Sequence, residues 1–145
     1  MPEIAAIWLK RFKRGPMDPV HSAELVAGRG LVGNANQGGK RQITIIDEAA
    51  WGDAVRETGV EVDPSRRRAN VMLRGLDLEK SRGKTLRLGA CVIRIYGETR
   101  PCEQMEAAQR GLRKALDPHW RGGAYGEIVE GGTIRLGDAA MFVDG

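Results

Sequence analysis

The sequence is poor in the residue types on which several functional classes depend. Its 145 residues include two cysteines, two histidines and few aromatic rings, namely three Trp, two Tyr and two Phe. Two cysteines exclude a disulfide-dense scaffold, and the absence of CxxC or HxxxH spacing excludes the common structural zinc motifs. The sequence has no apolar run of about twenty residues and no secretory signal after Met1-Pro2-Glu3. We therefore expect a single domain, residues 1–145, in the cytoplasm and without a membrane partner.

Positive charge is in excess. The 23 Lys and Arg residues outnumber the 19 acids, and 17 of them are arginine, whose planar fork suits phosphate and carboxylate. This predicts a basic surface for a small anionic ligand, although a GC-rich coding sequence also produces many arginines. A nucleic-acid partner is disfavoured, because so few aromatic rings leave little for base stacking. Composition leaves the oligomeric state open.

Glycines at the ends of short apolar runs indicate many short strands joined by tight turns. Leu86-Arg87-Leu88-Gly89 and Ile134-Arg135-Leu136-Gly137 each precede another apolar run, which indicates a strand, a glycine kink and a strand. We expect a mainly β fold, in which a bent antiparallel sheet forms a β-barrel-like structure with two helices at its ends. The predicted strands are Glu3–Lys10, His21–Ala27, Arg41–Ile46, Arg68–Leu73, Thr85–Leu88, Cys91–Tyr96, Tyr125–Val129, Thr133–Leu136 and Ala140–Val143.

Two segments carry helical signals. Asp47 is a good capping residue for the first helix, and Gly59 is a natural stop. The second helix is predicted from Pro101 to about Leu116, because proline suits the first helical position and apolar residues recur on one side. Residues 13–19, with two prolines and a glycine, are predicted to be a loop.

Cys102 is the strongest candidate for chemistry. It would lie in the first turn of the second helix beside Arg100, and both the free N–H groups and the cation favour a reactive thiolate. The alternative is a small buried side chain. Cys91 alternates with Ile93 in a strand and is predicted to be inert core, and the sequence leaves a disulfide between the two cysteines open.

The sequence gives no support for a catalytic pair between this thiol and a histidine, although it leaves His21 open. His119 lies beyond the far end of the predicted helix, about 25 Å from Cys102 if that helix is continuous. Nothing in the sequence places His21 nearby.

Two further segments could bind an anion. The Gly-rich stretch at 28–41 exposes backbone N–H groups and carries Arg29, Lys40 and Arg41. It matches neither a Walker A loop nor a dinucleotide fingerprint, and the alternative is a flexible hairpin loop. Arg66-Arg67-Arg68-Ala69-Asn70 leads into a predicted strand, where alternation would separate Arg67 from its two neighbours. The alternative for this run is a solvated charged face.

The ordered set of these stretches resembles the MOSC domain, the module found at the C-terminus of molybdenum cofactor sulfurases. Gly97-Glu98-Thr99-Arg100-Pro101-Cys102-Glu103 is similar to the cysteine motif of that family. The other matching stretches are residues 30–33, 41–47, 67–78, 122–129 and 131–138.

The resemblance implies a barrel-like fold and a pocket for the molybdenum cofactor, in which Cys102 ligates the metal or carries sulfur as a persulfide. Some standalone relatives reduce N-hydroxylated compounds, so a sulfur donor or an electron-transfer protein is the implied partner. Pyridoxal phosphate belongs to a separate domain of larger sulfurases and is not expected here. The candidate residues for holding the cofactor are Arg29, Asn34, Lys40, Arg41, Arg66, Arg67, Arg68, Asn70 and Arg100.

One position departs from the family pattern. Relatives often carry Gly-Asp after the glycine turn, whereas this chain has Gly33-Asn34, which keeps a hydrogen-bonding side chain without the charge. Whether the chain is an enzyme therefore stays open. The competing interpretation is a non-enzymatic basic barrel that binds an anion or nucleic acid, with Cys102 as a structural residue.

Overall fold

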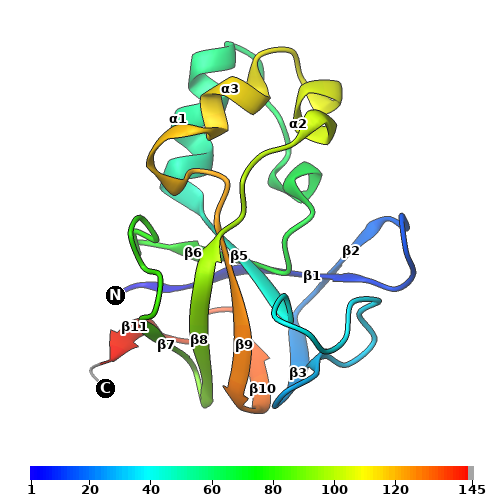
Figure 1. Cartoon of the computed structure of the whole chain (residues 1–145), viewed down its shortest axis with the longest axis vertical. Helices are drawn as coiled ribbons and strands as arrows, with labels where there is room; N and C mark the ends of the chain where they lie inside the picture. Colours follow the sequence, from blue (N-terminus) through cyan, green and yellow to red (C-terminus); the bar gives the residue numbers. More distant parts are fainter. Residues whose placement is uncertain (144–145) are drawn as a thin grey trace.

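The structure is a computed structural model that describes residues 1–143. Two β-sheets form one end of the molecule and short helices form the other (Figure 1). The larger sheet has the strand order β11-β7-β8-β9-β5-β6-β1-β2, and the smaller has the order β10-β3-β4. The larger sheet contains β1 (Glu3–Lys10), β2 (Met17–Val20), β5 (Ile43–Asp47), β6 (Val71–Arg74), β7 (Thr85–Leu88), β8 (Cys91–Glu98), β9 (Ala124–Glu130) and β11 (Ala140–Val143). The smaller sheet contains β3 (Ser22–Val26), β4 (Gly30–Leu31) and β10 (Gly132–Arg135).

The prediction of a mainly β fold is confirmed, but the sheet is mixed and does not close into a barrel. Strands β5 and β6 run parallel, and the other pairings of the described strands are antiparallel. The reason is the long connection between them, since helix α1 (Glu48–Thr58) starts directly after β5 and the segment from α1 to β6 brings the chain back so that β6 runs in the same direction as β5. Strands β11 and β2 remain as the two edges.

Alternation of apolar and polar residues builds the sheet core. In β8, Cys91, Ile93 and Ile95 are buried while Arg94 faces solvent. The pairing of β8 with β9 shifts register between Val92 and Ile93 and again between Ile95 and Gly97, and such irregularities let a sheet bend. Gly89 and Gly137, predicted as kinks, lie in the turns that follow β7 and β10, both with positive φ.

The first helix forms as its capping signals predict. The Asp47 Oδ1 atom accepts a hydrogen bond from the Ala49 N–H at 3.3 Å, and Gly59 ends the helix in the left-handed conformation. The second predicted helix is instead broken into α2 (Glu103–Ala108) and α3 (Leu112–Leu116). Gly111, at φ 88°, interrupts it, and the helix begins after Cys102 rather than at Pro101.

Other boundaries also differ from the prediction. The arginine run forms a 3₁₀ helix, η1 (Pro64–Arg67), and ends at Arg68 in the left-handed region with φ 65°. Strand β6 therefore begins at Val71, and strand alternation does not govern the three arginines. Part of the predicted loop at 13–19 pairs as β2 with β1.

The buried apolar side chains of the described residues form three clusters, one in the sheets, one among the helices and a small third one of Trp8, Ile46, Ala69 and Met72. The sheet cluster includes Ile7, Leu31 and Ile45, whereas the helical cluster includes Trp51, Met105 and Leu112. A second 3₁₀ helix, η2 (Pro118–Trp120), leads from α3 back towards β9. Within residues 1–143, no helix is both long and apolar enough to cross a membrane.

Candidate functional site

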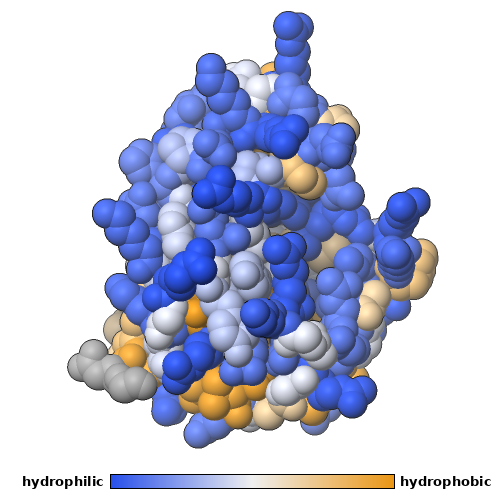
Figure 2. All heavy atoms as spheres, viewed as in Figure 1, coloured by the Kyte–Doolittle hydropathy of each residue, from blue (hydrophilic) through white to orange (hydrophobic). Residues whose placement is uncertain are grey.

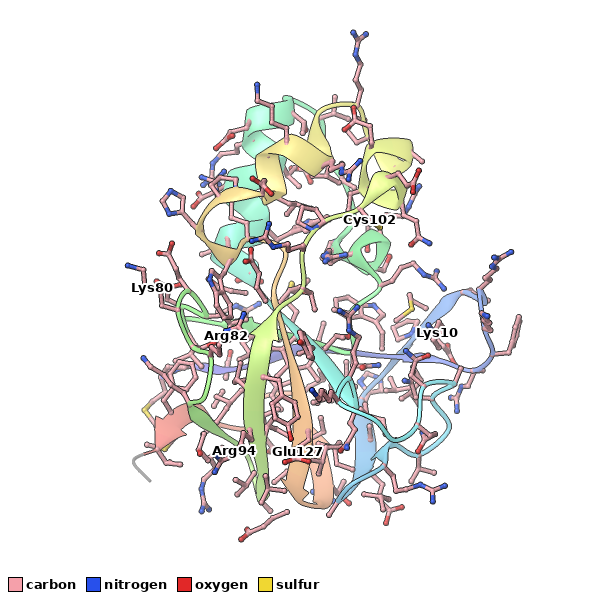
Figure 3. The ribbon with its side chains drawn as sticks, viewed as in Figure 1. Lys10, Lys80, Arg82, Arg94, Cys102 and Glu127 are labelled. Atoms are coloured by element: carbon pink, nitrogen blue, oxygen red, sulfur yellow. The ribbon has the colours of Figure 1, made fainter. Side chains whose placement is uncertain are left out.

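A pocket of about 790 Å³ lies where the helical end meets the sheet. Strands β1 and β2, the segment after β4, the start of β5, the η1–β6 connection and the segment from β8 into α2 all contribute to it. Figure 3 labels one residue from each side, Lys10 at the end of β1 and Cys102 before α2. The lining residues are Lys10, Lys13, Arg14, Met17, Asn34, Asn36, Arg41, Thr44, Arg66, Arg67, Arg68, Ala69, Asn70, Thr99, Arg100, Cys102, Gln104, Ala107, Ala108 and Gly122.

The pocket is strongly basic. Eight of its lining residues are lysine or arginine, and across the described residues 1–143 the lining includes no aspartate or glutamate. Hydrophilic side chains cover most of the visible face of the molecule (Figure 2). Cations without interspersed carboxylates attract and hold anions, so the pocket suits a ligand bearing phosphate or a similar oxyanion.

Cys102 is exposed at the edge of this pocket. It has an extended backbone, with φ −125° and ψ −176°, and stands immediately before α2, where its side chain accepts no capping hydrogen bond from the first turn of the helix. The alternative in which this thiol is buried packing is therefore wrong. Cys91 is fully buried, as predicted, and burial together with Asp138 raises the pKa of its thiol. Both cysteines are free, so no disulfide joins them.

Arg67 fixes the segment that leads to Cys102. Its Nε donates to the Gly122 carbonyl at 2.8 Å, and its Nη2 donates to the Thr99 carbonyl at 2.9 Å. Burial lowers the pKa of Arg67 below its ordinary value. The neighbouring Arg41 lowers this pKa further, whereas Cys102 raises it. The guanidinium of Arg67 therefore lies close to the side chains of Cys102 and Arg41.

Two further cations are held at the opposite wall. The Nη2 atom of Arg68 donates to the Gly15 carbonyl at 2.6 Å, which ties η1 to the turn between β1 and β2. Burial lowers the pKa of Lys10, and the neighbouring Arg68 and Lys13 lower it further. An anion in the pocket would relieve this repulsion between cations.

Two carboxamides form the floor between these walls. The Asn34 Oδ1 atom accepts from the Lys10 N–H at 2.8 Å and from Asn70 Nδ2 at 3.3 Å. Asn70 Nδ2 also donates to the Trp8 carbonyl at 3.3 Å, and Asn70 Oδ1 accepts from the Thr44 N–H at 3.2 Å. The two side chains thus connect β1, β5 and the loop after β4.

The structure brings most of the sequence-predicted site residues together. Arg41 lies over the Tyr125 ring, with its guanidinium carbon 4.8 Å from the ring centroid, and its side chain also reaches the pocket. Arg29 and Lys40 are exposed but do not line the pocket. Of the three basic residues predicted in the loop at 28–41, Arg41 alone lines the pocket. The predicted residues in the lining are Asn34, Arg41, Arg66, Arg67, Arg68, Asn70, Arg100 and Cys102.

Sequence reasoning missed several lining residues. Lys10, Lys13 and Arg14 come from the end of β1 and the turn after it. Four cations within residues 10–14 were a usable signal for them. Thr44 and Thr99 had no such signal, because each is an isolated polar residue in or beside a strand.

The histidines and acids do not assemble a metal site. Within the described part of the chain, no group of three or more His, Cys, Asp or Glu side chains is arranged to hold a metal. The Nδ1 atom of His119 lies 3.0 Å from Glu79 Oε2, away from the pocket lining. Cys102 is therefore the one residue of these four types that lines the pocket formed by residues 1–143.

Comparison with known proteins agrees with this architecture. Residues 28–140 match the MOSC domain family. The crystal structure of the YuaD protein from Bacillus subtilis is similar, with a TM-score of 0.79 and 20% identity over 97% of this chain and 94% of that one. YiiM from Geobacillus stearothermophilus has a TM-score of 0.74 and 17% identity, covering 99% of this chain and 76% of that one. YiiM from Escherichia coli has a TM-score of 0.74 and 16% identity, covering 100% of this chain and 71% of that one. At these identities the likeness establishes the fold alone, and no curated protein matches the chain.

Proposed function

The chain belongs to the MOSC domain family, and from that premise we propose that its basic pocket binds a molybdenum–pterin cofactor with the Cys102 thiolate contacting the metal. One observation carries the proposal. Eight cations line a pocket whose edge holds one exposed thiol. Cations suit the phosphate of such a cofactor, and a thiolate suits a soft metal centre.

The chemistry of the lining fits this group. Arg41, Arg67 and Arg100 lie in the same lining as Cys102, so charge for an oxyanion accompanies the sulfur ligand. Because residues 1–143 hold no cluster of three metal-binding side chains, the metal would have to arrive with its own organic ligand.

When bound, the cofactor would supply two-electron redox chemistry, with which an N-hydroxylated compound is reduced to its amine and water. The chain would position the substrate and provide protons. Lys10 is the candidate proton donor, because its lowered pKa makes transfer easier than from an ordinary lysine. The electrons would come from a separate electron-transfer protein, which the activity assay must include.

A second candidate function for the Cys102 sulfur is that of a sulfur carrier. The exposure of Cys102 and its lack of a capping hydrogen bond favour this candidate, because a donor protein could reach the sulfur. In that case the Cys102 thiolate would attack the outer sulfur of a persulfide on the donor protein, a new S–S bond would form on Cys102 as the donor's S–S bond breaks and its thiolate leaves, and the basic pocket would hold the acceptor. The two candidates predict different bound species, molybdenum in one and sulfane sulfur in the other.

Cytoplasmic location is part of the proposal. Both thiols are unpaired in the structure, which suits a reducing compartment.

The test is to express the protein in cells that make the molybdenum cofactor and to measure molybdenum, pterin and sulfane sulfur in the purified material. We expect molybdenum and pterin at comparable amounts in the wild-type protein and a loss of metal from Cys102→Ser. Sulfane sulfur without metal would instead support the carrier function. A protein that holds neither species, or a Cys102→Ser variant that loads fully, would leave the non-enzymatic anion-binding interpretation ahead.

A further inference from the structure

The positions of the oxygen and nitrogen in the Asn34 carboxamide follow from its hydrogen-bond network, which includes backbone groups that can only donate or only accept. A backbone N–H can only donate, so the Asn34 atom that faces the Lys10 N–H at 2.8 Å must be the oxygen. The same reasoning fixes Asn70, whose oxygen faces the Thr44 N–H and whose nitrogen faces the Trp8 carbonyl. The nitrogen of Asn70 then donates to Asn34 Oδ1, which confirms the first assignment independently.

This network uses the Asn34 oxygen and leaves its nitrogen available. Oδ1 accepts two hydrogen bonds, whereas Nδ2 makes none with any residue between 1 and 143. The residue is 7% exposed and lines the pocket. Among residues 1–143, Ser81 Oγ is the side-chain atom that is both fully buried and without a partner, so Asn34 Nδ2 is open to the pocket, where a ligand or water can accept its hydrogen bonds.

We propose that Asn34 Nδ2 is a specificity-determining donor, which hydrogen-bonds to an oxyanion held by the surrounding cations. The inference rests on the proposed function, because it assigns one contact within that pocket. The occupant it selects is an acceptor-only group, such as a phosphate or sulfate oxygen. A ligand that presents a donor or a cation at this point would leave Nδ2 unpaired and meet the charges of Lys10 and Arg68.

The substitution Asn34→Asp isolates this contact. A carboxylate keeps the oxygen that accepts from Lys10 and Asn70, and it replaces the donor by a negative acceptor of nearly the same size. Asn36→Asp is the matched control, since Asn36 also lines the pocket but is exposed. Inorganic sulfate is the probe, because it stays doubly charged throughout the working pH range.

We expect Asn34→Asp to weaken sulfate binding by at least about tenfold near pH 7.5, and Asn36→Asp by less than about threefold. Lowering the pH until the introduced carboxylate protonates should restore much of the loss relative to the wild-type protein at the same pH, because a carboxylic acid is neutral and can donate. Equal losses in the two variants, or a loss that acid does not reduce, would overturn the proposal.

Nuclear magnetic resonance of the wild-type protein supplies a readout that does not depend on how the variant folds. The Asn34 side-chain amide signal should shift with sulfate concentration and saturate with the measured affinity. The Asn70 amide, whose nitrogen is already bonded within the protein, should shift much less. Sulfate binding without movement of the Asn34 signal refutes the inference alone, whereas no sulfate binding to the wild-type protein refutes it together with the anion pocket.

Discussion

The Arg67 guanidinium donates through Nε to the Gly122 carbonyl at 2.8 Å, across 55 positions of sequence. The same side chain reaches the Thr99 carbonyl through Nη2. Thr99 in turn donates from its hydroxyl to the Gly122 carbonyl at 2.7 Å. One arginine therefore joins η1 to the segment before Cys102 and to the turn before β9.

Replacing Arg67 by Met should destabilise the protein by about 2–4 kcal/mol, because it removes charge-assisted bonds to partly buried carbonyls and leaves those oxygens unpaired. Urea unfolding measures the loss. Arg66→Met is the control, since Arg66 is exposed, and its effect should stay within about 0.5 kcal/mol. Similar midpoints for both variants would contradict the tethering role.

The two thiols should react at very different rates. Cys102 is exposed, whereas Cys91 is fully buried and its pKa is raised by burial and by Asp138. Iodoacetamide at neutral pH should label Cys102 at least about a hundredfold faster, with Cys91 labelled only on unfolding. Mass spectrometry of digested samples locates the label, and early modification of Cys91 would refute the expectation.

Gly123→Ala should cost at least about 3 kcal/mol, because an added Cβ would collide with the Ile45 carbonyl where backbones lie close together. Gly38→Ala is a close control, since Gly38 also has a positive φ but open space around its Cα atom. That control isolates the conformational penalty, about 1 kcal/mol. If thermal unfolding finds equal losses, crowding at Gly123 is not the cause.

Anion affinity should depend on the charge of Lys10. Burial, Arg68 and Lys13 place its pKa below the ordinary value of 10.5. At a pH below this lowered pKa the lysine is charged and sulfate binds at full strength. As the pH rises through the pKa, the lysine loses its charge and the sulfate affinity should fall by about fivefold. Lys10→Arg should remove this decline in a calorimetric titration, and an unchanged pH profile would exclude Lys10 as its source.

Position in the pocket should matter more than charge alone. Arg41→Gln should weaken sulfate binding by about threefold to tenfold, because Arg41 lines the pocket. Arg29→Gln removes the same charge from outside the lining and should change the affinity by less than about twofold. The comparison is informative at moderate salt, where distant charges are screened, and equal effects would mean that only net charge attracts the anion.

The sequence predicted those parts of the fold that depend on local signals. Helix α1 begins after Asp47 and ends at Gly59, as expected from their capping signals. The alternation around Cys91 correctly predicted which side chains of β8 are buried. The interruption at Gly111 was missed because apolar residues continue with helical spacing on both sides of it. The left-handed conformation of Arg68 could not be predicted, since its hydrogen bond to the Gly15 carbonyl depends on tertiary packing.

The candidate site was predictable in its charges but not in its borders. The arginine run and the motif around Cys102 are visible in sequence, and both line the pocket. Arg29 and Lys40 were grouped with them because they share a loop with Arg41, yet loop neighbours need not face the same way. Lys10 lies beside Asn34 because its backbone N–H donates to the Asn34 side chain, a contact between segments 24 residues apart.

The two walls of the pocket rest on different hydrophobic clusters. Met105, just after Cys102, belongs to the helical cluster, whereas Leu9 and Leu31, beside Lys10 and Asn34, belong to the sheet cluster. Segments with separate cores can open independently, and amide hydrogen exchange reports such units. A ligand that contacts both walls would couple them, so occupancy should slow exchange in α1 and α3, far from any atom the ligand touches.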